Sequence, residues 1–146
     1  MCEEWKIVVT AIVTIVGSVV VFSLGQIVQR FLIEPIHNLN NTIGQIESAI
    51  RLFGDVINGP GSGSEDRQRE ASMKLRELSA SLRCHIHVIN DAAYRFAWSM
   101  PSKTDLREAA SSLMGISNSL SQERHLEANL KNIEKVRRCL RIPAID

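Results

Sequence analysis

The residue types best suited to chemistry gather in one short stretch, SLRCHIHVINDAAY at positions 81–94. A histidine can move a proton near neutral pH and an arginine can hold a phosphate, and cleavage of RNA needs this combination. Arg83, His87 and Asn90 are therefore the candidate catalytic residues. On a helical wheel they share one stripe with Arg76.

Two other interpretations of this stretch need no catalysis. Cys84, His87 and Asp91 are spaced as on one face of a helix, and zinc accepts all three residue types as ligands. His85 points away from His87, because residues two apart on a helix do not face each other, and the other two histidines are isolated. We therefore predict no metal and no cofactor. A polar face that is solvated or packed against another subunit is the favoured interpretation, in a protein that is more an interaction module than an enzyme.

The composition allows one small helical domain. The chain has 146 residues and a formal net charge of +1, so no strong overall field would attract nucleic acid. Its three cysteines are too few and too scattered for a disulfide framework, which favours a reducing compartment. With two Trp, one Tyr and four Phe, the core must be mostly aliphatic.

Residues 7–24 read IVVTAIVTIVGSVVVFSL, a run without a charge. A helix that crosses a hydrocarbon core needs about 20 apolar residues, and the apolar character resumes after Gly25 and Gln26. A signal peptide would have a more basic start, a shorter apolar run and a small-residue cleavage site. We therefore predict one transmembrane helix within an N-terminal segment, residues 1–33.

Basic residues on either side of a span predict its orientation. Lys6 precedes the span, whereas Arg30 and Arg51 follow it. The domain behind the span also carries two of the cysteines and has no export signal of its own. We predict that the N-terminus lies outside and that the domain lies in the cytoplasm, with the lipid bilayer as the first partner.

Small and polar residues recur along one side of the predicted span. This span stripe consists of Thr10, Thr14, Ser18, Gly25 and Gln29. Such residues let helices approach closely in lipid, where apolar contact alone gives no selectivity. We interpret the stripe as the face of a homo-oligomer, and in a sharper version as the lining of a water-filled path. The plainer interpretation is that the span is only an anchor.

The remaining residues, 34–146, are predicted to form a helical cytoplasmic domain. The span should kink or end at Glu34-Pro35, since the residue before a proline avoids the α region. Apolar residues at spacings of three and four then predict four helices, at 36–57, 67–99, 102–120 and 126–140. A Gly/Ser-rich loop at 58–66 separates the first two.

Each predicted helix has an expected inward face. These faces are Ile36, Leu39, Ile43, Ile46, Ile50, Phe53 and Ile57; Leu75, Leu78, Leu82, Ile86, Ile89, Ala93 and Phe96; Leu106, Ala110, Leu113, Ser117 and Leu120; and Leu126, Leu130, Ile133, Val136 and Leu140. Ser64 and Ser102 offer N-caps, the latter in a capping box with Asp105. The predicted fold is all-α: one N-terminal transmembrane helix, then an antiparallel four-helix-bundle-like cytoplasmic domain.

The last predicted helix carries a basic cluster, which consists of Lys131, Lys135, Arg137, Arg138 and Arg141. A basic cluster can attract anionic lipid headgroups or nucleic acid. Cations are also favourable at the C-terminus of a helix, and this structural interpretation is the commoner one.

The segments FLIEPIHNLNNTIGQI, LRELSASLR, PSKTDLREAASSLMGISNSL and NIEKVRRCLRI resemble a set of uncharacterised bacterial single-span membrane proteins with a small helical cytoplasmic domain. The resemblance covers about residues 30–141. Its most distinctive piece is the helix that ends in GISNSL, where Ile116 replaces a leucine of the family pattern. It implies the architecture and a bacterial inner-membrane location, and no activity.

The order of span, helices and arginine–histidine pair is also similar to the membrane accessory family of type VI-B CRISPR systems. That family joins one span to a HEPN-like helical domain and assembles into a ring-shaped membrane pore. HEPN ribonucleases place their arginine and histidine further apart than Arg83 and His87, which three residues separate. The similarity implies an oligomer that dissipates the membrane potential during phage defence.

The sequence thus predicts a membrane-anchored helical protein that self-associates through its span, with pore formation in antiviral defence as the sharpest form. One alternative is a membrane-tethered HEPN-like ribonuclease, for which nucleic acid would be a partner. The other is a plain membrane adaptor for a cytoplasmic protein.

Overall fold

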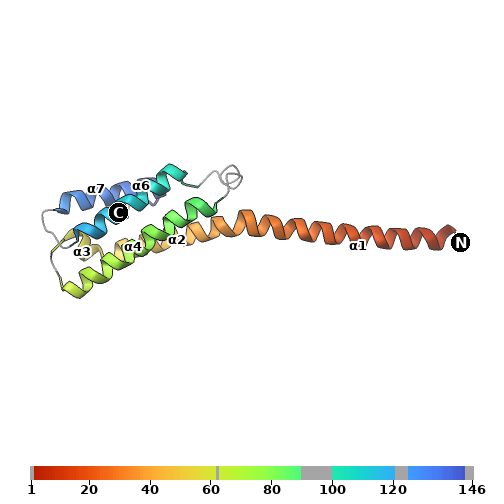
Figure 1. Cartoon of the computed structure of the whole chain (residues 1–146), viewed down its shortest axis with the longest axis horizontal. Coiled ribbons are helices and arrows are strands. Elements are labelled where there is room, and N and C mark those ends of the chain that lie inside the picture. The colour runs from red at the N-terminus through yellow and green to blue at the C-terminus, as the bar shows by residue number, and fades with distance from the viewer. Residues whose placement is uncertain (1, 62, 90–99, 121–124, 144–146) are drawn as a thin grey trace.

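The computed structural model describes residues 2–61, 63–89, 100–120 and 125–143, and all regular structure in these ranges is helical. The elements are α1 (Cys2–Val28), a π-helical turn (Gln29–Ile33), α2 (Glu34–Leu52), α3 (Gly54–Asn58), α4 (Glu65–Val88), α6 (Lys103–Ser119) and α7 (Leu126–Leu140). Figure 1 shows α1 projecting as a rod from the compact group that the other helices form. The predicted all-α class is confirmed.

One helical rod joins α1 to α2, from Glu3 to Leu52, and the expected end of the helix at Glu34-Pro35 does not occur. A proline inside a helix lacks the N–H and crowds the carbonyl four residues earlier. Here the π-helical turn comes directly before Pro35, and the N–H of Glu34 bonds to the carbonyl of Gln29 five residues back. The wider turn accommodates the proline ring and its missing N–H without ending the helix.

The first predicted cytoplasmic helix is divided in two. Along α2, Leu39, Ile46 and Ile50 are buried as expected, and two further expected positions, Ile36 and Ile43, are partly buried against the core. The backbone then leaves the helical region at Phe53, with φ −103° and ψ 16°. The short helix α3 follows and buries Val56 and Ile57.

Helix α4 begins as predicted and ends early. Ser64 is its N-cap and accepts a hydrogen bond from the Arg67 backbone N–H. The helix ends at Val88, and Ile89 is extended, with φ −77° and ψ 116°, and buried. The predicted continuation to Ser99 is therefore wrong, because two adjacent β-branched residues weaken the helix and Ile89 reaches the core from an extended backbone. The expected inward residues Ala93 and Phe96 lie outside the described residues.

Helix α6 follows its prediction closely. The Asp105 N–H donates to Ser102 Oγ at 3.1 Å and the Ser102 N–H donates to Asp105 Oδ2 at 3.0 Å, so the capping box is complete. The Ser102 hydroxyl also donates to Asp105 Oδ2 at 2.7 Å, and this bond, together with that from the Ser102 backbone N–H, lowers the pKa of the Asp105 carboxyl. All five expected inward residues are buried.

Helix α7 buries a different face at its start from the one predicted. Ile133, Val136 and Leu140 are buried, but the side chains of Leu126 and Leu130 are 38% and 47% exposed, so the prediction is wrong for these two. Asn129 is fully buried instead, and its Oδ1 accepts a hydrogen bond from Ser119 of α6. A polar contact thus sets the rotation of the first turn of α7.

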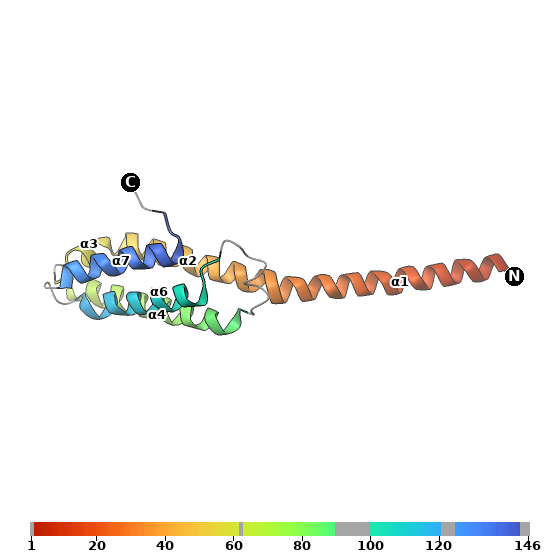
Figure 2. The same cartoon turned by 90° about the horizontal axis from the view of Figure 1, so that it is seen from above.

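The helices other than α1 share one aliphatic core. Helix α6 packs most extensively against α4 and α7, while α2 packs against α4 and α3 against α7. Figures 1 and 2 show the end of α2, the start of α4, the end of α6 and the start of α7 at the pole away from α1. Phe53 is the one aromatic side chain among the described buried residues, as the composition predicted.

A charged contact joins helices at the pole away from α1. The Arg67 side chain donates from Nε to Asp55 Oδ2 at 2.8 Å and from Nη2 to the Leu52 carbonyl at 3.0 Å, and its guanidinium lies 5.7 Å from the Phe53 ring centroid. The hydrogen bond from Arg67 lowers the pKa of Asp55. The start of α4 is thereby fastened to the end of α2 and to α3.

A second polar contact joins α4 to α2 near the pole of the helical group that α1 adjoins. His85 Nε2 lies 2.9 Å from Thr42 Oγ1, which also donates to the Asn38 carbonyl. Since a hydroxyl has one proton, a neutral His85 that keeps both bonds donates from Nε2. Burial lowers the pKa of the His85 imidazole.

This contact predicts that stability falls with acidification. A histidine whose pKa is lower in the folded state binds more protons when the chain is unfolded, so stability is lost as the pH falls through about 6.5, the ordinary pKa of the imidazole. We expect the melting temperature to decrease between about pH 7.5 and 5.5 and this decrease to be smaller in His85→Gln, which keeps a side-chain donor for Thr42. Circular dichroism melts at both pH values measure the difference. His37→Gln, at an exposed position of α2, is the control, and an unchanged slope in His85→Gln would contradict the assignment.

Candidate functional site

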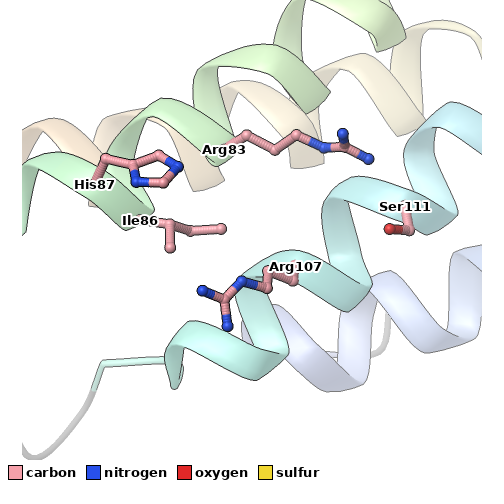
Figure 3. Close-up of a pocket in the computed structure, with 5 residues that line it drawn as sticks. All are labelled: Arg83, Ile86, His87, Arg107 and Ser111. Carbon is pink, nitrogen blue, oxygen red and sulfur yellow. The ribbon is translucent and has the colours of Figure 1, made fainter.

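Arg83 and His87 line one cleft between α4 and α6. The other lining residues are Ile86 of α4 and Arg107 and Ser111 of α6, and the cleft has a volume of about 280 Å³. Figure 3 shows the two arginines spread along the cleft, with Arg83 on the α4 ribbon and Arg107 on the α6 ribbon. We call these five residues the cationic cleft.

The charge in the cationic cleft has no partner among the described residues. Its described lining includes no carboxylate, and in the same part of the chain neither Arg83 nor Arg107 forms an ion pair. Both side chains and that of His87 are exposed, whereas Ile86 is buried at 6% exposure. Like charges on two packed helices repel, and a bound anion would offset that repulsion.

The cleft is better suited to binding an anion than to cleaving RNA. Two guanidinium groups can hold phosphate oxygens, and the Ser111 hydroxyl adds a further hydrogen-bond donor. Cleavage by general acid–base catalysis needs groups that take up and release protons in turn, and the described lining residues include a single imidazole, that of His87, and no carboxyl group.

The structure keeps two of the sequence-predicted residues together and separates a third. Asn90 lies outside the described residues. Arg76 lies on the same side of α4, two turns before Arg83, but does not line the cleft: its Nε donates to Ser117 Oγ at 3.0 Å and its Nη2 donates to Asn118 Oδ1 at 3.0 Å. Sequence reasoning also missed Arg107, because nothing in the spacing of α6 relates it to α4.

The GISNSL segment is a polar seam between helices. Ser117 Oγ lies 2.9 Å from Ser72 Oγ of α4 and accepts from Arg76, while Ser119 donates to Asn129 of α7. A Cβ on Gly115 would lie 3.1 Å from the Asn132 side chain, so α7 approaches closely there. The most distinctive piece of the family-like pattern therefore serves packing of α6 against both of its neighbours.

The basic cluster of α7 is partly neutralised. Lys135 forms an ion pair with Glu108 of α6 at 3.2 Å, and Glu134 lies beside Lys131, Lys135 and Arg138 around one shallow cavity. Burial raises the pKa of the neighbouring Cys139 thiol. Arg137 and Arg138 lie in the last turn of α7, where cations are favourable, while the cluster's attraction to lipid or nucleic acid stays a prediction.

The span stripe lies on a fully exposed helix. One helix in the described part of the chain is long and apolar enough to cross a membrane, and none of its most apolar stretch is buried. The hydroxyls of Thr10, Thr14 and Ser18 each donate at 2.8 Å to the carbonyl four residues earlier. A Cβ at Gly25 would meet nothing within 4 Å beyond the adjacent residues and backbone of its own helix.

Comparison with known proteins identified no relative of this chain. A scan of protein-family models, a search of curated proteins and a search of solved structures each gave no match. The two resemblances drawn from the sequence therefore stay hypotheses, and the functional argument rests on the geometry of this chain.

The ribonuclease hypothesis makes a separate prediction. If the cationic cleft cuts RNA, His87→Ala and Arg83→Ala should each abolish cleavage by the full-length chain and leave its melting temperature unchanged, because both side chains are exposed. A fluorescent RNA cleavage assay in detergent measures this. Arg69→Ala on the same helix is the control, and a wild-type chain that never cuts RNA would contradict the hypothesis.

Proposed function

We propose that this chain is a membrane-anchored helical protein that self-associates through α1, with α2, α4, α6 and α7 as an antiparallel four-helix bundle in the cytoplasm. The supporting observation is that α1 is apolar on all sides and exposed throughout, from Val9 at 39% to Val21 at 70%. A helix that is hydrophobic all round is stable only inside a membrane or a large core. Burial in a bilayer would contribute about 1.5–3 kcal/mol for each large aliphatic side chain.

The hydroxyls of the span stripe favour direct helix contact. Because Thr10, Thr14 and Ser18 already bond to backbone carbonyls, they need no water and add little bulk. Close approach and van der Waals packing of small residues drive association in lipid. A dry contact between copies is therefore favoured over a water-lined pore, and pore formation in phage defence stays a prediction beyond this proposal.

The π-helical turn aligns the span stripe with a row of small and polar residues on α2. A π turn holds one more residue than an α turn, which sets the following residues back by about 100° around the axis. With that setback, the mean direction of Asn41, Gly44 and Ser48 lies roughly 40° from the mean direction of the span stripe; in an uninterrupted α-helix it would lie roughly 140° away. One side of the whole rod thus carries small and polar residues.

That side of α2 borders an open groove. The groove lies between α2 and α4, has a volume of about 870 Å³, and is lined by the three residues above together with Gln45, Ala49, Leu52, Phe53, Glu70, Met73 and Lys74. Leu52 and Met73 are each 60% exposed, and a Cβ at Gly44 would meet nothing within 4 Å. A second copy that meets α1 in parallel would place its own α2 along this groove, so we assign the groove to the same interface.

The first test concerns the span. Gly25→Leu adds bulk to the span stripe and should reduce the mass of the full-length protein in mild detergent, as measured by light scattering with the detergent contribution subtracted. Val20→Leu, on the opposite side of α1, should leave the mass unchanged. A wild-type monomer would contradict self-association and favour the plain adaptor.

The second test concerns the groove. Gly44→Leu fills open space, and leucine has the higher helix propensity, so the melting temperature should stay the same or rise while the oligomer weakens. Ala80→Leu, at an exposed position of α4 outside the groove, is the matched control. An oligomer of wild-type mass in Gly44→Leu would exclude the groove from the interface and leave the role of α1 intact.

A further inference from the structure

The cationic cleft is the strongest candidate for a binding site beyond self-association. We propose that it binds a phosphate group, carried either by an anionic lipid headgroup or by a small soluble molecule. The proposal concerns α4 and α6, whereas the proposed oligomer contact involves α1, α2 and the other side of α4. The two can therefore succeed or fail separately.

The charge pattern of the described residues distinguishes this cleft. Several cations have an acidic or polar partner: Arg51 with Glu47, Arg67 with Asp55, Arg69 with Glu65, Lys74 with Glu77, Lys135 with Glu108, and Arg76 with Ser117 and Asn118. Lys6, Arg30, Lys131, Arg137 and Arg138 have no such partner among the described residues, but the cationic cleft alone among the described cavities is lined by an arginine without an ion pair from each of two packed helices and by no described carboxylate. Arg83 and Arg107 have no such partner within the described ranges, although α4 and α6 form the most extensive helix contact. Two guanidinium groups, one on each of two packed helices and neither paired within the described residues, would be stabilised by a bound anion.

The cleft also has the donor types that suit phosphate. A guanidinium presents a planar fork of N–H groups that matches phosphate oxygens, and the two forks are spread along the cleft (Figure 3). His87 and Ser111 stand beside them as further donors, and Ile86 forms an apolar wall. A ligand with two or more anionic oxygens could contact both arginines, so a diphosphate group is the smallest matched probe.

The position of the cleft puts both sources of phosphate within reach. Figure 2 shows the last turns of α4 and the first turns of α6 at the pole where α1 leaves the domain. His85 is level with Thr42, nine residues beyond Ile33, which at 1.5 Å per residue is about 14 Å past the end of the apolar run. The negative surface potential of a lipid leaflet extends for about a Debye length of 8–10 Å beyond its headgroups. The open rim of the cleft also admits a soluble phosphate.

The first arm of the test uses pyrophosphate. The full-length chain in non-ionic detergent is titrated by calorimetry at low salt, and each of Arg83→Gln and Arg107→Gln should weaken binding by about tenfold or more, as loss of a charge-assisted hydrogen bond does. Arg69→Gln removes the same charge from the far end of α4, where Arg69 pairs with Glu65, and should bind as the wild type does. Equal binding by the wild type and both cleft variants would overturn the site.

The second arm uses lipid. The chain is reconstituted in phosphatidylcholine vesicles with or without phosphatidylglycerol, and the melting temperature is compared for the wild type and the Arg83→Gln/Arg107→Gln double variant. A rise with phosphatidylglycerol that the double variant lacks identifies the headgroup as the source. Pyrophosphate binding without that rise identifies a soluble phosphate, and absence of both effects overturns the proposal. Binding of a short oligouridylate through the two arginines, with neither pyrophosphate nor lipid effect, would make the cleft a nucleic-acid site and would also overturn it.

Discussion

The structure depends on one continuous helix whose surface changes character along its length. From Ile7 to Val28 it is uncharged and predominantly apolar, and from Glu34 to Leu52 it is amphipathic, so the first part needs an apolar surrounding while the second needs helices to pack against one face. The π-helical turn between them keeps the rod helical in spite of Pro35. Because no loop intervenes, the direction of the span fixes the direction of α2, and through α2 that of the whole helical group.

Polar contacts decide how the other helices are arranged around α2. Burial of aliphatic side chains drives packing but is not directional, so on its own it would allow several rotations of each helix. Arg67 holds the start of α4 to Asp55, and His85 holds its last turns to Thr42. The Ser117 hydrogen bonds and the buried Asn129 then set α6 and α7. An unpaired polar group in such a place costs more than a made bond contributes, so the contacts select one arrangement.

Sequence reasoning succeeded where a signal is local and failed where the partner is remote. The capping box at Ser102 involves residues three apart, and periodicity finds the inward faces of α4 and α6 because burial repeats with the helix. Neither can show that α7 turns Asn129 inward instead of Leu130, since the reason lies in Ser119. The cationic cleft was predicted only in part for the same reason. Arg83 and His87 are neighbours on one helix and could be grouped by their spacing, whereas Arg107 comes from another helix.

Helix α4 separates two surfaces that differ in chemistry. Glu70, Met73 and Lys74 border the groove beside α2, while Arg83 and His87 border the cationic cleft beside α6, and the two sets point roughly 115° apart around the α4 axis. A second copy in the groove would therefore leave the cleft open. Each added copy would bring two more arginines, which have no ion-pair partner among the described residues, to the pole nearest α1, so assembly would concentrate positive charge there. Because the repulsion among those charges grows with the number of copies, anion binding and assembly would favour each other, in keeping with the reciprocity of linked equilibria.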